Sequence, residues 1–250
     1  MRKGVNDEDN PIASGVYGIE ELEEVEEKAS RPTQWAMVRS RMYKGLQPTH
    51  PKLPSGTYIV TLDRSDGNMV FIKRDIKVDK IIYFRDSLAA KIVSEITNFW
   101  HNAKKFQESG FLHRRGYLLY GPQGSGKSII VNQVASNIVL AGGLVLLCEN
   151  PKFLNMALTV LRQAEPIRNV VCIFEDIDAI IKAYGEDELL SVLDGANMVD
   201  RVLNIATTNY PERLDKRIVS RPRRFDRVIK VSVPDKIIRR AFLKIKLPKG

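Results

Sequence analysis

The chain has 250 residues, of which 44% are hydrophobic and 28% are charged. This composition is typical of globular proteins and excludes a disordered or fibrous chain. The longest apolar stretch, residues 138–148, is far shorter than the ~20 residues that span a bilayer. Residues 1–10 are charged and lack the apolar segment of a secretory signal. We therefore expect a soluble, cytoplasmic protein without a membrane anchor.

The net charge of +9 is unevenly distributed along the chain. Residues 1–30 contain three lysines and arginines against nine aspartates and glutamates, whereas residues 211–250 contain fourteen against four. A basic segment of this kind can bind the phosphates of a nucleic acid. A nucleic-acid partner is therefore one interpretation, although the basic excess is local and has a second explanation given below.

The two cysteines are predicted to be reduced core residues. Cys148 and Cys172 lie in apolar runs, and the three histidines are scattered. Neither residue type follows the spacing of metal ligands.

Residues 1–77 are predicted to form a small α+β accessory module. Residues 20–28 are rich in glutamate and predict a helix, and residues 33–43 predict a second, because Trp35, Val38 and Met42 follow helical spacing. After a proline-rich linker, residues 57–62 and 69–73 flank a polar turn that contains Gly67. This pattern is typical of a β-hairpin.

Residues 78–250 are predicted to form the main domain. Ser87 can cap a helix whose apolar residues recur every three or four positions until Gly110. Short apolar runs then alternate with helical patterns, at residues 117–120, 144–148, 170–174, 202–206 and 228–233. Continuous apolar runs are typical of strands buried on both faces of a parallel sheet. The predicted fold class is α/β, with a parallel sheet flanked by helices.

The sequence GPQGSGKS fits the eight-residue P-loop pattern and lies between a predicted strand and a predicted helix at residues 128–140. Its glycines allow the backbone N–H groups and the helix N-terminus to face phosphates, Lys127 supplies a positive charge, and Ser128 offers a hydroxyl to Mg²⁺. We therefore predict that ATP and Mg²⁺ bind here. The predicted nucleotide-binding residues are Gly121, Pro122, Gln123, Gly124, Ser125, Gly126, Lys127, Ser128 and Ile129.

Two acidic residues, Glu175 and Asp176, directly follow the apolar run at residues 170–174. This order predicts carboxylates at the C-terminal edge of a strand beside the P-loop. One carboxylate can hold Mg²⁺ through its water shell, and the next can accept a proton from the attacking water. Asp178 is predicted to support this pair.

The motifs together resemble the AAA branch of the AAA+ P-loop ATPases, from about residue 79 to residue 235. The segments that carry the resemblance are residues 113–122, 174–178, 189–195, 206–209 and 221–226. The double arginine before Gly116, the Glu-Asp order and the Leu-Asp-Gly segment at residues 193–195 are most similar to the mitochondrial AAA translocases of the folded Rieske iron–sulfur protein. The resemblance implies a P-loop NTPase fold and ATP hydrolysis.

By this resemblance, Asn209 is the sensor that positions the attacking water and contacts the γ-phosphate. Arg221 and Arg224 are arginine fingers, which enter the neighbouring subunit's site and stabilise the transition state. Such fingers require a homo-oligomeric ring, expected to be a hexamer or heptamer. The basic excess of residues 211–250 is then at least partly a subunit interface that faces phosphates.

The sequence departs from the family pattern in three places. Glu175 takes the metal-binding position and Asp176 that of the catalytic base, so the base is one methylene shorter than usual and the two roles could be exchanged. Gln123 replaces a proline of the P-loop. The sequence ends at Gly250, where the helical lid of the family begins, so we expect this lid to be absent or truncated.

Three functions are compatible with these motifs. The first is a ring-forming motor that remodels or translocates a protein substrate, with Phe153 near the position of an aromatic pore loop. The second is a DNA-handling ATPase of the helicase-loader type that uses the basic C-terminal segment. The third is a nucleotide-gated scaffold that binds ATP with little hydrolysis, because Asp176 is a poor base.

Overall fold

The computed structural model divides the chain into two compact units, Met1–Leu53 and Pro54–Gly250. It describes residues 34–39, 42–46, 50–65, 67–74, 87–194, 199–219, 224–234, 236 and 239–240. Within these residues, no helix is long and apolar enough to cross a membrane. The cytoplasmic location remains a prediction.

Within the first unit, β1 (Gln34–Arg39) and β2 (Met42–Leu46) form a hairpin and pair in antiparallel register. The helix predicted at residues 33–43 is therefore wrong. Three apolar residues at helical spacing are a weak signal, and tryptophan, valine and tyrosine favour strands when a second strand pairs with them. The helix predicted at residues 20–28 lies outside the described residues.

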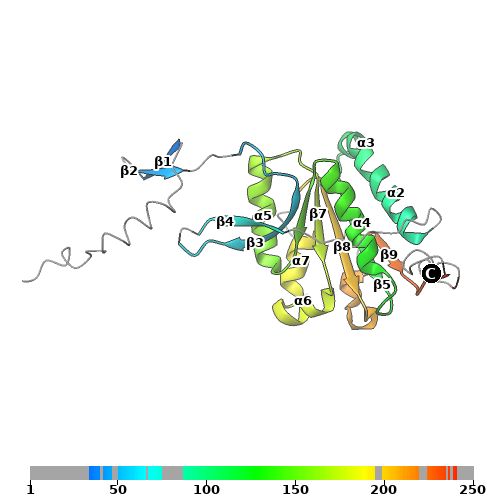
Figure 1. The fold of residues 1–250 in the computed structure, drawn as a ribbon. Coiled ribbons are helices and arrows are strands. Elements are labelled where there is room, and N and C mark those ends of the chain that lie inside the picture. Colours follow the sequence, from blue (N-terminus) through cyan, green and yellow to red (C-terminus); the bar gives the residue numbers. More distant parts are fainter. Residues whose placement is uncertain are drawn as a thin grey trace, which may run out of the picture. The chain divides into compact units, whose positions relative to one another are not determined.

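The second unit is built on a seven-stranded sheet in the order β4-β3-β6-β7-β8-β5-β9 (Figure 1). Its strands are β3 (Gly56–Leu62), β4 (Met69–Arg74), β5 (Arg114–Tyr120), β6 (Leu144–Leu147), β7 (Val170–Phe174), β8 (Val202–Thr208) and β9 (Arg227–Lys230). All neighbours are parallel except the edge strand β4, which pairs antiparallel with β3. The predicted α/β fold with a parallel sheet is confirmed.

The hairpin predicted at residues 57–62 and 69–73 forms as β3 and β4, but it lies in this sheet and not in a separate N-terminal module. The break between the units falls after Leu53, before this hairpin, and not at residue 77. Parallel pairing of β3 with β6 joins the hairpin to the sheet. A local turn pattern predicts a hairpin but not which strand pairs with its outer edge.

Helices cover both faces of the sheet (Figure 1). One face carries α2 (Leu88–His101), α3 (Ala103–Glu108) and α4 (Lys127–Leu140), and the other carries α5 (Pro151–Ala164), α6 (Ile177–Tyr184) and α7 (Glu186–Asp194). Alternate residues of the strands, such as Tyr117 and Leu119 of β5, pack with α2 and α4 in one core. The short helices η1 (Pro211–Arg213) and α8 (Lys216–Val219) follow β8.

Ser87 caps α2 as predicted, because its side chain accepts a hydrogen bond from the backbone N–H of Ala90 at 3.2 Å. The helix predicted to continue to Gly110 is interrupted at Asn102, where α2 ends and α3 begins. The Asn102 side chain donates to the backbone carbonyl of Asn98 at 2.7 Å. Asparagine competes in this way with backbone hydrogen bonding, which favours a break.

Both cysteines are free and buried, as predicted. Burial raises the pKa of the Cys172 thiol to about 12 and also raises the pKa of the Cys148 thiol. Both side chains are therefore protonated and unreactive at neutral pH.

His113 lies in an aromatic cluster at the start of β5. Its ring stacks on Phe99, with centroids 4.1 Å apart, and also contacts Trp100 and Phe106. The Nε2 atom lies 2.8 Å from the backbone carbonyl of Phe99, so it carries the donated proton, and the buried Nδ1 has no hydrogen-bond partner among the described residues. Burial lowers the pKa of His113, although the bond to Phe99 opposes this shift.

We predict that His113 makes the free energy of unfolding depend on pH. When the folded-state pKa of a histidine is lowered, the side chain is neutral in both folded and unfolded protein well above the unfolded pKa of about 6.5, so stability there does not depend on it. As pH falls below that value, the unfolded chain takes up the proton more readily, and the fold is destabilised. Urea unfolding between pH 8 and pH 5 should show a steeper loss for the wild type than for His113→Gln, which keeps a donor but does not titrate. Equal slopes for the two proteins would contradict the buried neutral state.

Candidate nucleotide-binding and catalytic site

The P-loop joins the end of β5 to the start of α4. Gly126 adopts a left-handed conformation with φ 98° directly before Lys127, the first residue of α4. Gly121 passes so close to β9 that a Cβ atom there would lie 2.1 Å from the backbone oxygen of Val231. Two of the glycines are therefore required by backbone shape, and the N-terminal N–H groups of a 14-residue helix face the loop.

The Lys127 ammonium group lies within this loop, and the residue as a whole is 8% exposed. It donates to the backbone carbonyls of Gly121 at 2.8 Å and Pro122 at 3.0 Å, and to the side-chain oxygen of Asn209 at 2.7 Å. Burial lowers the pKa of Lys127, and the nearby Asp176 carboxylate opposes this shift. A partly desolvated ammonium held by neutral oxygens can bind an anion strongly, because a phosphate provides the opposite charge that these oxygens lack.

The predicted acidic pair lies at the same edge of the sheet. Glu175 and Asp176 follow the end of β7, and both side chains are exposed. The Asn209 amide nitrogen lies 3.5 Å from the Asp176 carboxylate. The structure therefore brings Lys127, Asp176 and Asn209 together, although they come from three separate parts of the chain.

Asp176 has a left-handed backbone conformation, with φ 48° and ψ 59°. Non-glycine residues seldom adopt it, and it is concentrated at functional sites. Asp176 also precedes α6 as its N-cap residue, yet its carboxylate makes no hydrogen bond to that helix. The carboxylate is therefore available to the site instead of being used to cap the helix.

Two threonines at the end of β8 contact the acidic turn, and our sequence analysis missed both. The Thr207 hydroxyl accepts a hydrogen bond from the backbone N–H of Asp176 at 3.1 Å. The Thr208 hydroxyl donates to the Asp178 carboxylate at 2.7 Å and accepts from the backbone N–H of Tyr210 at 2.9 Å. The supporting role predicted for Asp178 thus has a partner in β8. The sequence did carry a signal for them, because two residues with hydroxyl groups directly precede Asn209.

A Mg²⁺ ion fits the donors of this site. Ser128 and Glu175, the predicted metal ligands, are exposed at the ends of neighbouring elements. Among the described residues, no group of three or more histidine, cysteine, aspartate or glutamate side chains could hold a metal ion by itself. Mg²⁺ in nucleotide sites takes one or two protein oxygens and completes its shell with phosphates and water, so this sparse set of ligands suits it.

Of the two predicted arginine fingers, Arg224 lies among the described residues. Arg221 lies outside the described residues. Arg224 is buried within its own subunit, where its guanidinium pairs with the Asp194 carboxylate at 2.6 Å and also donates to the backbone carbonyl of Arg217. This position differs from the one expected of a finger, which must be free to reach a neighbouring subunit.

Phe153, predicted near a pore loop, lies in the first turn of α5 and is half-buried, whereas its neighbour Lys152 is exposed. Asn150 caps this helix through bonds from the backbone N–H groups of both residues. Phe153 thus belongs to the first turn of a capped helix, and its role in a pore loop stays a prediction.

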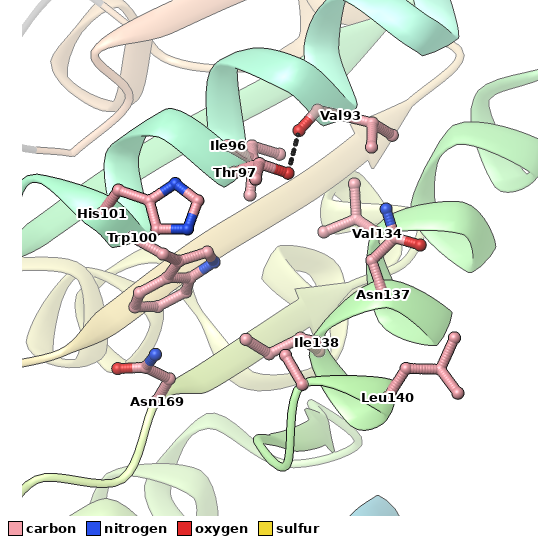
Figure 2. Close-up of a pocket in the computed structure, with 11 residues that line it drawn as sticks. Val93, Ile96, Thr97, Trp100, His101, Val134, Asn137, Ile138, Leu140 and Asn169 are labelled. Carbon is pink, nitrogen blue, oxygen red and sulfur yellow. Dashed lines mark hydrogen bonds between the residues drawn. The ribbon is translucent and has the colours of Figure 1, made fainter.

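A pocket of about 390 Å³ lies between α2 and α4, away from the P-loop (Figure 2). Trp100 and Ile96 of α2 face Val134 and Ile138 of α4 across it. These α4 residues belong to the second half of the helix, whereas the P-loop is at its first residue. The pocket is thus separate from the candidate nucleotide site.

Comparison with known proteins agrees with this geometry. The family model for the ATPase family associated with various cellular activities (AAA) matches residues 117–233. "Protein SAV" of Sulfolobus acidocaldarius is 34% identical over 159 residues, which cover 56% of this chain and 20% of that protein. The "ATP-dependent zinc metalloprotease FtsH" of Clostridium perfringens is 33% identical over 177 residues, covering 63% of this chain and 24% of that protein.

A third relative is the "Probable mitochondrial chaperone BCS1-A" of Dictyostelium discoideum. It is 29% identical over 196 residues, which cover 71% of this chain and 46% of that protein. The chain therefore spans less than half the length of each of these three relatives.

The left-handed conformation of Asp176 gives a prediction about stability. Asp176→Gly should be more stable than Asp176→Ala by about 1 kcal/mol, because a Cβ atom is unfavourable in this conformation. The order should reverse at the exposed helical position Lys91, where alanine should be more stable than glycine by about 1 kcal/mol. Urea unfolding of the four variants tests this. An Asp176→Ala protein at least as stable as Asp176→Gly would contradict the observed backbone.

Proposed function

We propose that this chain, whose residues 117–233 match the family model for AAA ATPases, binds Mg²⁺–ATP at its P-loop and hydrolyses it with Asp176 as the general base. One observation carries the proposal: Lys127, Asn209 and Asp176 lie in one chain of contacts at the C-terminal edge of the sheet. Parallel α/β sheets bind ligands at this edge.

Each residue has a distinct role in this proposal. The backbone of Gly121–Ile129 surrounds the phosphates, and Lys127 leaves the carbonyls of its own loop to pair with them. Ser128 and Glu175 hold Mg²⁺, which neutralises charge on the phosphates. Asp176 accepts the proton of the attacking water. Asn209 orients this water and, through its contact with Lys127, the γ-phosphate.

We further propose that the protein acts as a homo-oligomeric ring, a hexamer or heptamer, that remodels or translocates a protein substrate. Two facts support this proposal. The resemblance of residues 221–226 to an arginine-finger segment implies a neighbour that receives Arg221. A relative that aligns with 71% of this chain is named a probable mitochondrial chaperone. In its most specific form, this proposal has a folded protein such as the Rieske iron–sulfur protein as the substrate.

Replacing the proposed base should separate ATP binding from hydrolysis. Asp176→Asn keeps the shape and tolerates the left-handed backbone, but it accepts no proton, so hydrolysis should fall about 100-fold or more. Its affinity for ATP should stay within about 3-fold of the wild type, because Asp176 does not bind the phosphates. Titration with a fluorescent ATP analogue and a phosphate-release assay measure the two quantities.

Lys127→Ala serves as the contrasting variant, because it should lose ATP binding itself. Wild-type affinity in Lys127→Ala would refute the P-loop assignment. If Glu175→Gln stops hydrolysis and spares Mg²⁺-dependent binding while Asp176→Asn remains active, the roles of the two acids are exchanged.

Mixing inactive subunits should distinguish the two arginines. Arg221→Ala subunits keep an intact P-loop and Lys127→Ala subunits keep an intact Arg221, so hydrolysis should partly return where the first meets the second in a ring. Arg224→Ala should instead lower the thermal unfolding temperature of its own subunit, because it removes a buried guanidinium that pairs with Asp194. Full activity of Arg221→Ala at every protein concentration would contradict the finger.

A further inference from the structure

Asp176 needs external support to keep its backbone conformation. The left-handed region costs a non-glycine residue roughly 1–2 kcal/mol. Such a conformation persists only when surrounding contacts impose it. Its carboxylate makes no capping bond to α6, and α6 holds only its backbone carbonyl, which accepts from the N–H groups of Ala179 at 2.8 Å and Ile180 at 3.3 Å. The backbone N–H on the other side of the Asp176 Cα is therefore the group that needs a partner outside this helix.

The support comes from Thr207, one strand away. Phe174 of β7 is paired with Ala206 of β8, so the next residue of β8 lies beside the turn that carries Glu175 and Asp176. The Thr207 side chain is buried at 5% exposure, and its hydroxyl accepts the backbone N–H of Asp176 at 3.1 Å. This bond fixes the backbone of the proposed base to β8, the strand directly followed by Asn209.

Two residues at or directly after the end of β8 also contact the Asp176 side chain and Asp178. Asn209 lies 3.5 Å from the Asp176 carboxylate, and Thr208 binds the Asp178 carboxylate at 2.7 Å. Thr207 and Thr208 of β8 and Asn209 directly after it thus all contact the acidic turn. Of these three residues, Thr207 is the one that contacts the Asp176 backbone, through its N–H group, and so fixes the direction of the Asp176 side chain.

We propose that Thr207 is a positioning residue for hydrolysis: its hydroxyl holds Asp176 in the left-handed conformation that directs the carboxylate toward the site and away from α6. This inference rests on the proposed role of Asp176 as the base. Thr207 itself touches neither nucleotide nor water in this proposal, and it acts only through Asp176. Removal of its hydroxyl should therefore change kcat and leave nucleotide binding unchanged.

Thr207→Val tests the role, because valine has nearly the same shape but no hydroxyl. In the full-length protein, kcat for ATP should fall about 10-fold and KM should stay within about 2-fold, since a small displacement of a catalytic group reduces rate more than binding. Thr207→Ser should restore kcat to within about 2-fold of the wild type. Thr57→Val is the matched control, because Thr57 is a buried threonine of β3 in the same sheet, and it should leave kcat unchanged.

A double substitution separates a positioning role from a general loss of structure. In the Asp176→Asn background, Thr207→Val should cause no further fall in kcat, because residues that act through one group are not additive. A further fall of about 10-fold would indicate a separate structural effect and overturn the inference. If Asp176→Asn alone hydrolyses ATP at the wild-type rate, the proposed base is wrong, which is a different failure.

Amide hydrogen exchange gives a readout that does not depend on turnover. The Asp176 N–H should be protected in the wild type and in Thr207→Ser, and it should exchange at least about 10-fold faster in Thr207→Val, since exchange requires the bond to open. Exchange at the amide of Cys172, in the middle of β7, should be the same in all three proteins. Unchanged protection of Asp176 in Thr207→Val would overturn the inference.

Discussion

The parallel alignment of β7, β8 and β5 is the constraint on which the candidate site depends. These strands are neighbours in the sheet, and their carboxyl ends lie at one edge. The P-loop follows β5, the acidic pair follows β7, and Asn209 follows β8. Because the strand bodies are buried by helices on both faces, polar groups can be gathered only where the strands end.

Electrostatics and backbone shape at this edge both act against local stability. Lys127 is largely buried and desolvation lowers its pKa, and its charge is met by neutral oxygens and by the nearby Asp176 carboxylate. Asp176 keeps an exposed carboxylate at the expense of an unfavourable backbone conformation. Both features reduce stability locally and prepare groups for a charged ligand. Strain and desolvation are concentrated at functional sites for this reason.

Arginines from two parts of the chain meet at the C-terminal end of α7. Arg114 of β5 donates to the backbone carbonyls of Val192 and Leu193, at 3.2 and 3.0 Å, and Arg224 pairs with Asp194. Positive charge at a helix C-terminus is favourable because the last carbonyls are otherwise unpaired. Arg224 therefore has an internal explanation, and the inter-subunit role proposed from the sequence pattern depends on Arg221.

The sequence by itself determined the local features of this protein. The P-loop, the four buried strands from β5 to β8, the cap at Ser87 and the acidic pair each depend on residues a few positions apart, and each lies in or beside the predicted element. The fifth predicted strand, at residues 228–233, is instead the mostly exposed edge strand β9, because only its tertiary neighbours decide whether a strand is covered. The tertiary structure decided the contacts between distant residues. Lys127 meets Asn209 across 82 positions, Asp176 meets Thr207 across 31, and Arg224 turns inward to Asp194. The pairing of β3 with β6, which places the hairpin in the sheet, belongs to the same group. Spacing along the chain encodes the periodicity of one helix or strand. The partner of a side chain at the end of a strand depends instead on which strands lie next to one another in the sheet.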